Sequence, residues 1–464
     1  MRLQRSLLAA ALLLPAAAFA LPRGVTPLRT DGNSSGLARA ARAAAPPANA
    51  HLFYYGGPVI SNVHVVPVFW GPNVPSAVTS QIGNFYAAVT DSSHFDFLAE
   101  YDTNVADYAG QPGTGQHIGR GTAEAAITIT PSVAGSKITD AQISAEIKAQ
   151  IAAGHLPAQT ADTLYMVHFA AGMSISLPDG SGGTAASCKQ FCAFHSTIAA
   201  PTNIYYGVIP NVTSDGCELG CGAVGGGFNN TTAVAAHEMI EAVTDPAVGL
   251  ATANAPPLAW YDPQGSNGEI GDICNAAIGT IISHNQTWSV QKEWSNTHGA
   301  CIAEAGSVDF AVSLHPDNQA IAAGHTATYT LTSAKTAATP GTITLDATGL
   351  PTGFTATFSK TSIAPGDSAT VTIAVSAAAT NGADSFSVHG TSGGVTHKAA
   401  AQATVTGGTA GGGGGGGGGN CPSGSIDVGG ICIPVGCGTG AEVPTWLGLA
   451  GVAAFLFRKR RAQA

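Results

Sequence analysis

Charged residues are scarce in this chain of 464 residues. Asp, Glu, Lys and Arg make up 10% of it, and the 18 basic residues are outnumbered by 28 acidic ones, which gives a formal net charge of −10. A surface that binds nucleic acid needs clustered Lys and Arg side chains to contact phosphates. The composition therefore excludes nucleic acid as a partner, and we expect a neutral or proteinaceous one, such as an extracellular protein or peptide.

The apolar run near the C-terminus is short for a membrane span. As a helix, residues 444–457 would reach about 21 Å, against a hydrocarbon core of ~30 Å. The basic cluster at 458–461 follows this run and should stay on the cytoplasmic side. We predict that residues 444–464 form a short membrane anchor, preceded by a glycine-rich linker at 407–420 and a small cysteine module at 421–443.

The N-terminus has the pattern of a secretory signal. Arg2 and Arg5 precede an apolar core, and Ala18 and Ala20 form a small-x-small cleavage site at the end of residues 1–20. Residues 21–50 lack a periodic apolar pattern, which predicts a disordered spacer or a pro-segment. We expect an exported protein, secreted or held at a bacterial cell surface.

Nine cysteines in an exported chain favour disulfides over reduced thiols. Six lie between residues 188 and 301, and they allow 15 connectivities. We predict that the two CxxxC pairs, Cys188/Cys192 and Cys217/Cys221, are joined to each other and that Cys274 pairs with Cys301. Zinc on these cysteines is the alternative, although CxxxC is a poor zinc spacing. Near the C-terminus, Cys421 would pair with Cys432, which leaves Cys437 for processing or lipidation.

Two folded domains are expected between these ends. Residues 51–305 alternate predicted strands, such as 62–70, 163–169 and 203–209, with predicted helices, such as 77–89 and 140–153. This order predicts a layered α/β domain of the zincin type. Residues 307–406 instead contain seven short alternating segments, which predict an all-β immunoglobulin-like sandwich.

One predicted helix of the first domain carries a histidine and two carboxylates in an apolar run. His237 and Glu241 are four residues apart, so both side chains lie on one helix face, with Glu238 beside them. The zincin pattern HExxH places two metal ligands at this spacing and uses the intervening Glu as general base; here Glu replaces the second His. We therefore predict His237 and Glu241 as metal ligands and Glu238 as the catalytic base. A structural polar network is the alternative.

A catalytic metal site of this kind needs a third protein ligand. Asp272 is the first choice, and Glu269 and His284 are additional candidates. Zinc is the expected ion, but a ligand set rich in carboxylates keeps calcium and manganese open. His168 and His195 are expected in or beside the sheet, as core residues or as residues that support the ligands.

Several segments resemble the Exordium or phosphate-induced protein family across residues 52–303. The matching segments are Tyr54-Tyr55-Gly56-Gly57-Pro58-Val59, Phe191-Cys192-Ala193-Phe194-His195, Ala236-His237-Glu238 with Glu241 and Pro246, Ala259-Trp260-Tyr261, and Glu269-Ile270 with Asp272 and Cys274. The family's plant members are extracellular proteins linked to cell expansion. At the other end of the chain, the order of Cys437, a short apolar helix and terminal arginines resembles bacterial C-terminal sorting signals.

Two functions from different classes remain open on the sequence. The first is a secreted zinc metallopeptidase, in which Glu238 activates a metal-bound water. The second is a non-catalytic extracellular signalling or wall-associated protein, in which a metal only braces the helix against the loop at 269–274.

Overall fold

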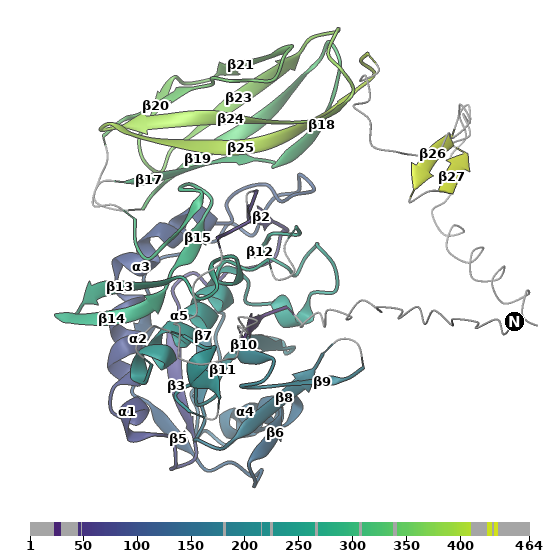
Figure 1. Cartoon of the computed structure of the whole chain (residues 1–464). Coiled ribbons are helices and arrows are strands. Elements are labelled where there is room, and N and C mark those ends of the chain that lie inside the picture. Colours follow the sequence, from purple (N-terminus) through teal and green to yellow (C-terminus); the bar gives the residue numbers. More distant parts are fainter. Residues whose placement is uncertain are drawn as a thin grey trace, which may run out of the picture. The chain divides into compact units, whose positions relative to one another are not determined.

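The computed structural model describes residues 23–28, 45–47, 49–179, 182–214, 216–222, 226–264, 268–305, 309–336, 341–409, 425–428 and 431–434 (Figure 1). Residues up to Ala410 form one compact unit, and residues from Gly411 form a second. The predicted signal peptide and membrane anchor lie outside the described residues, as do Cys421 and Cys437. Among the described residues, no helix is both long and apolar enough to cross a membrane.

A seven-stranded sheet forms the centre of the N-terminal part. Its strands follow the order β1-β10-β11-β7-β3-β4, with β5 also paired to β3. β3, β7 and β11 run parallel, whereas β10 is antiparallel to β11 and β1 is antiparallel to β10. The bounds are β1 Val25–Pro27, β3 His64–Trp70, β4 Thr122–Ala123, β5 Ile127–Ile129, β7 Thr163–His168, β10 Phe191–Ile198 and β11 Ile204–Ile209.

Helices cover both faces of this sheet, but they are few. The longest, α5 (Phe228–Thr244), packs on β10 and β11, and α4 (Asp140–Ala152) belongs to the apolar cluster on the opposite face. α4 begins with a capping box formed by Thr139 and Gln142. The other helices are α1 Ser76–Thr79, α2 Ile82–Thr90, α3 Ser93–Asp96, and the 3-10 helices η1 Phe97–Tyr101, η2 Cys217–Leu219, η3 Val248–Leu250 and η4 Asp272–Cys274.

The expectation of a layered α/β domain of the zincin type is wrong. In the structure as a whole, strands account for 39% and helices for only 17%, so the fold is mainly β. Four further small sheets surround the central one: β2 Phe53–Tyr54 with β12 Trp260–Tyr261; β6 Lys137–Thr139 with β8 Ser174–Pro178 and β9 Thr184–Ala186; β13 Ile278–Ser283 with β14 Gln286–Gln291; and β15 Glu293–Ser295 with β16 Ala300–Ile302. Most of these strands are two to six residues long. They are too short to show a clear period in the sequence.

Residues 310–406 are all-β and form two sheets. One has the order β17-β19-β23-β21 and the other β18-β25-β24-β20-β22. Their apolar faces make one cluster that includes Val371, Ile373 and Val388. The bounds are β17 Phe310–His315, β18 Asn318–Ala322, β19 Thr326–Lys335, β20 Ile343–Asp346, β21 Phe354–Phe358, β22 Ser362–Ile363, β23 Ser368–Val375, β24 Gly382–Ser392 and β25 Val395–Thr406. The predicted boundary between the two domains falls on residues 306–308, outside the described residues.

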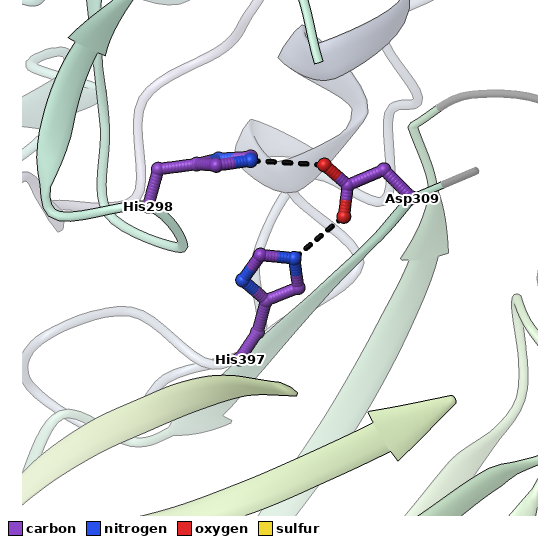
Figure 2. Close-up of side chains that lie close together, drawn as sticks. All are labelled: His298, Asp309 and His397. Atoms are coloured by element: carbon purple, nitrogen blue, oxygen red, sulfur yellow. Dashed lines mark hydrogen bonds and ion pairs between the residues drawn. The ribbon is translucent and has the colours of Figure 1, made fainter. Parts of the chain in front are cut away.

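Histidine–aspartate contacts join this sandwich to the N-terminal part. Asp309, just before β17, lies between His298 of the N-terminal part and His397 of β25 (Figure 2). Asp317 lies between His51 and His315 in a similar way. The second compact unit contributes one described hairpin, β26 Ser425–Val428 with β27 Ile431–Pro434. Cys432 lies in β27, and its pairing with Cys421 stays a prediction.

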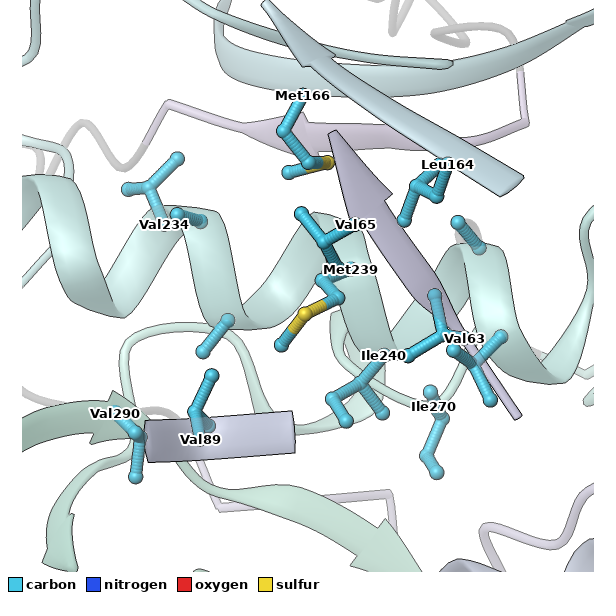
Figure 3. Packing of buried hydrophobic residues seen from close by; sticks show 14 of the residues in the cluster. Val63, Val65, Val89, Leu164, Met166, Val234, Met239, Ile240, Ile270 and Val290 are labelled. Carbon is cyan, nitrogen blue, oxygen red and sulfur yellow. The ribbon is translucent and has the colours of Figure 1, made fainter. Parts of the chain in front are cut away.

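The core beneath α5 explains why this helix is fixed in place. Val65, Leu164 and Met166 project from the sheet toward Met239 of the helix, and Val290 of β14 closes the opposite side (Figure 3). All of these side chains are buried. Burying an aliphatic side chain of this size contributes roughly 1.5–3 kcal/mol. The polar residues of α5 are therefore held on a helix that cannot turn without breaking an apolar core.

Candidate metal centre

α5 carries three ionisable residues into the protein interior. His237, Glu238 and Glu241 are each 0% exposed. The helix ends at Thr244, and Asp245 accepts a hydrogen bond from the backbone N–H of Ala259. Asp245 therefore serves as the turn residue that follows the helix. Three buried ionisable groups within little more than one helical turn need partners, because an unpaired buried charge is costly.

His237 faces two of the predicted ligands. Its Nε2 lies 3.0 Å from Oε1 of Glu241 and 3.6 Å from Oδ1 of Asp272. On the other side of the ring, the amide nitrogen of Gln291 lies 2.6 Å from Nδ1 and also donates to the carbonyl of Gly271. These two contacts fix the direction of the imidazole ring. The atoms of His237, Glu241 and Asp272 all lie within 4.8 Å of one another and could hold a metal ion.

The loop from Glu269 to Cys274 approaches the helix because Gly271 lacks a side chain. A Cβ at Gly271 would lie 2.8 Å from Nδ1 of His237 and 2.9 Å from Oε1 of Glu241, closer than real Cβ contacts allow. The backbone N–H of Asp272 donates to the same Oε1. The disulfide between Cys274 and Cys301 ties the end of the loop to β16. The loop is therefore held against α5 at both its centre and its end.

His195 on β10 joins a second group of ligands to the first. Its Nδ1 lies 3.3 Å from Glu238 and 3.6 Å from Glu241, and its Nε2 lies 3.3 Å from Glu269. His195, Glu238 and Glu241 form a further set that could hold a metal ion, and Glu241 belongs to both sets. Sequence reasoning placed His195 in or beside the sheet but did not select it as a ligand. The sequence feature that could have identified His195 is its position as a histidine in the apolar segment 191–195.

Strand β1 covers the cluster. The N–H of Gly24 donates to Glu269, and the hydroxyl of Thr26 donates to Glu238. β1 also pairs with β10 next to His195, whose N–H donates to the carbonyl of Gly24. A cavity of about 710 Å³ lies at the junction with the sandwich, but no residue of the cluster lines it. The side chains of the cluster are at most 2% exposed, so the cluster is closed to a substrate in this structure.

Several polar atoms of the cluster are left without hydrogen bonds. Among the described residues, Nε2 of His195, Nε2 of His237, Oε2 of Glu241, Oε1 of Glu269 and Oδ1 of Asp272 have no hydrogen-bond partner. His237 Nε2 and Glu241 Oε1 are close but are not aligned for a hydrogen bond. Buried polar groups are normally paired, so each exception needs an explanation. A bound cation would supply a partner for such atoms.

Burial and mutual repulsion shift the pKa values in the cluster. Burial raises the pKa of Glu241 and of Asp272 well above the usual carboxyl range, and neighbouring carboxylates raise both further. Burial alone would lower the pKa of His195, but Glu269 and Glu238 raise it well above its usual value. His195 is therefore protonated at neutral pH, while the two carboxyl groups resist ionisation as long as no cation is bound.

Two other histidines considered on the sequence, His284 and His168, contribute no ligand to the buried cluster. His284 is half-exposed in the β13–β14 turn beside Asp91, and the structure does not bring it to the cluster. His168 is buried and bonded to the hydroxyl of Tyr86, and burial lowers its pKa to about 3, so it stays neutral. Glu269, a second choice on the sequence, does reach the cluster, through His195.

The three disulfides pair as the sequence predicts. Cys188 bonds to Cys217, Cys192 to Cys221 and Cys274 to Cys301. Disulfides form and persist in oxidising compartments. They fit an extracellular or surface location.

Comparison with known proteins does not identify a family. No family model matches the chain, and no curated protein matches it. Among solved structures, domains 4 and 5 of the S-layer protein SbsC match at 18% identity with a TM-score of 0.17, over 26% of this chain and 58% of that one. The VesB protease of Vibrio cholerae matches at 16% identity with a TM-score of 0.16, over 21% of this chain and 31% of that one. Likenesses this weak carry no functional argument.

Proposed function

We propose that this chain is an exported surface protein that holds one divalent ion in the buried cluster, through His237, Glu241 and Asp272. The observation that carries the proposal is the group of buried ligand atoms without hydrogen bonds, one on each of these three residues. They come from a helix and from a disulfide-tethered loop, so the ion would brace the loop against α5. Zinc is the first choice because it accepts nitrogen and carboxylate ligands together.

The charges of the cluster support a bound cation. Glu238, Glu241, Glu269 and Asp272 each lie within 4 Å of a histidine nitrogen of the cluster. One imidazolium, on His195, and one divalent ion would balance three of the four negative charges. Without the ion, burial and neighbouring carboxylates keep the pKa values of Glu241 and Asp272 raised. A set this rich in carboxylates also suits manganese or calcium, so the choice of ion is a matter for experiment.

The alternative is a polar network without metal, and Gln291 distinguishes the two. As the amide now lies, its nitrogen donates to Nδ1 of His237, so this ring nitrogen is an acceptor. A metal on Nε2 instead requires the proton on Nδ1 and an oxygen opposite it. Gln291→Glu supplies that oxygen and should keep or raise metal affinity. Gln291→Leu offers no oxygen to Nδ1 of His237 and should weaken metal affinity roughly 10–100-fold.

Zinc titration of the purified protein tests the proposal. We expect His237→Ala and Asp272→Asn each to bind one equivalent fewer than the wild type, whereas the matched control His284→Ala, outside the cluster, should bind as the wild type does. Equal zinc binding by wild type and His237→Ala would refute the site. Far-ultraviolet circular dichroism should accompany each titration, so that loss of metal is not confused with loss of fold.

Peptide hydrolysis is the second candidate, favoured by the position of Glu238. This carboxylate follows the proposed ligand His237 directly and could activate a water on the ion. Its oxygen is now bound by Thr26, so activity requires that β1 leave the cluster. In protein freed of residues 23–28, Glu238→Gln should abolish peptide cleavage and retain the ion. Cleavage that persists in this variant would refute Glu238 as the base, and absence of cleavage in the uncovered wild type would leave the non-catalytic reading.

The non-catalytic reading keeps the ion as a structural brace. It agrees with the resemblance to the extracellular Exordium family, which remains an expectation from the sequence. Attachment to a membrane through residues 444–464 belongs to the same proposal. Release of the protein from membranes after deletion of residues 444–464 would support that attachment, and unchanged fractionation would contradict it.

A further inference from the structure

A second group of metal-binding side chains lies where the sandwich meets the N-terminal part. Nε2 of His298 is 2.9 Å from Oδ2 of Asp309, and Nε2 of His397 is 2.5 Å from Oδ1 of the same carboxylate (Figure 2). All three residues offer ligand atoms within 4.8 Å of one another. We propose that His298, Asp309 and His397 form a zinc site that clamps the sandwich to the N-terminal part.

The three residues come from separate elements. His298 lies in the turn between β15 and β16, Asp309 directly precedes β17, and His397 lies in β25. His298 and Asp309 are 11 residues apart in sequence, whereas His397 is 88 residues from Asp309. An ion bound to all three would therefore cross-link the end of the N-terminal part to the last long strand of the sandwich. This is a tie that the backbone connection alone does not provide.

The ligand chemistry and the access route both fit zinc. Two imidazoles and one carboxylate are ligands that zinc accepts, and three protein ligands leave a fourth position for water. Bonds of about 2.0–2.1 Å place neighbouring ligand atoms roughly 3–3.5 Å apart, so zinc can replace the shared protons with modest side-chain adjustment. The side chain of His298 is 21% exposed while Asp309 is 6% exposed, so an ion can enter from solvent beside His298 and be held below the surface.

The ring of His298 is already oriented for this role. Its Nδ1 lies 2.9 Å from the hydroxyl of Ser295, which also accepts a hydrogen bond from the backbone N–H of His298. A partner on the second ring nitrogen fixes the tautomer and direction of a metal-binding histidine. Replacement of Ser295 by Ala should therefore lower zinc affinity roughly 10–100-fold without removing a ligand.

The other histidine–aspartate group at this junction serves as an internal control. Asp317 lies 3.9 Å from Nε2 of His51 and 3.6 Å from Nδ1 of His315. These are longer separations than those around Asp309, and His51, His315 and Asp317 do not offer three ligand atoms within 4.8 Å of one another. The residues are of the same types at the same junction but do not converge as closely. We expect them to bind no ion.

The test counts zinc bound by the full chain and its variants at neutral pH. His298→Ala and His397→Ala should each bind one equivalent fewer than the wild type, and His51→Ala should bind as many. Because His237→Ala removes only the equivalent in the buried cluster, failure of that site and failure of this one give different counts. In the His237→Ala background, added zinc should raise the melting temperature, and this rise should vanish when His298→Ala is added.

Two results would overturn the proposal. One is zinc stoichiometry unchanged in both His298→Ala and His397→Ala. The other is a melting temperature of His237→Ala that does not respond to zinc, which would mean that Asp309 is held by hydrogen bonds alone. His298 is partly exposed, so its replacement guards against a result caused by misfolding of the more deeply buried His397 variant.

Discussion

The buried cluster under α5 and the group around Asp309 contain the same kinds of residue in opposite electrostatic conditions. Around Asp309, each carboxylate oxygen has a histidine partner, and the bonds to His298 and His397 hold the pKa of Asp309 below its usual range although burial opposes this. Around Glu241, ligand atoms lack partners, and burial raises the carboxyl pKa values instead. The group around Asp309 is satisfied by protons alone, whereas the cluster is satisfied only by a cation or by protonation.

The difference shows why a count of histidines and carboxylates does not by itself identify a site that depends on metal. What separates the two groups is the ratio of carboxylates to histidines and the depth of burial. Two histidines per carboxylate can share protons, but four carboxylates around two histidines cannot. The cluster should therefore depend on its ion for stability, while the Asp309 group should gain from zinc without needing it.

The largest effect is expected from Glu293→Gln in metal-free protein. Glu293 is fully buried beside the cluster, neither of its oxygens has a hydrogen-bond partner among the described residues, and burial raises its pKa to about 8 from 4.5. Because the folded-state pKa is raised, the wild type loses stability as pH rises from about 4.5 to 8. The variant should therefore be more stable at pH 9 by up to about 5 kcal/mol and nearly unchanged at pH 4. Urea unfolding with chelator at both pH values measures this. An equal difference at the two pH values would contradict it.

Loss of the Cys274–Cys301 disulfide should have the next largest effect. The bond closes a loop of sequence separation 27, which corresponds to about 3–4 kcal/mol in the chain-entropy description. It also holds the loop that carries Asp272, so metal affinity at the cluster should fall in the Cys274→Ala/Cys301→Ala double variant. Cys188→Ala/Cys217→Ala, which removes a bond of similar loop length, is the matched control for stability. Equal loss of metal affinity in both double variants would contradict a specific role of the Cys274–Cys301 disulfide in positioning Asp272.

Asp309→Asn should lower the stability of the protein without added metal, whereas Glu293→Gln raises it, and the effect should be smaller. The pKa of Asp309 is lowered in the folded state, so its ionised form contributes stability that is present above about pH 4 and is lost as pH falls. The variant should lose about 1–3 kcal/mol at pH 7. The loss should shrink toward pH 2, as thermal unfolding across this range would show. A variant more stable than the wild type at pH 7 would mean that ionised Asp309 destabilises the folded protein. The two groups would then not differ in the way proposed here.

Local sequence patterns predicted the parts of the site that are close in sequence. His237 and Glu241 share a helix face because of their spacing, and the segment at 269–274 was selected as a polar group that follows the helix in the sequence. Residues 140–153 were predicted as a helix, and α4 ends one residue earlier. The sequence also predicted that the two CxxxC pairs join each other, and the structure shows which cysteines pair. For the helices and the helix face, the information lies within a few residues of the feature that it predicts.

The missed parts depend on contacts between distant segments. Gly24 reaches Glu269 across 245 residues, and Thr26 reaches Glu238 across 212. No local period in residues 23–28 indicates that they add an edge strand to β10, because strand pairing is set by the partner as much as by the strand. The excess of β structure was missed for a similar reason, since short hairpins such as β13–β14 gain their stability from packing on α5.

The metal content of the purified full chain, compared with that of His237→Ala, tests the central claim most directly. Both proteins would be purified without chelator and analysed by inductively coupled plasma mass spectrometry. The account predicts that the wild type carries one equivalent of divalent metal more than His237→Ala, whatever the group around Asp309 binds. Equal metal content in the two folded proteins would contradict it, and the cluster under α5 would then be a protonated polar network.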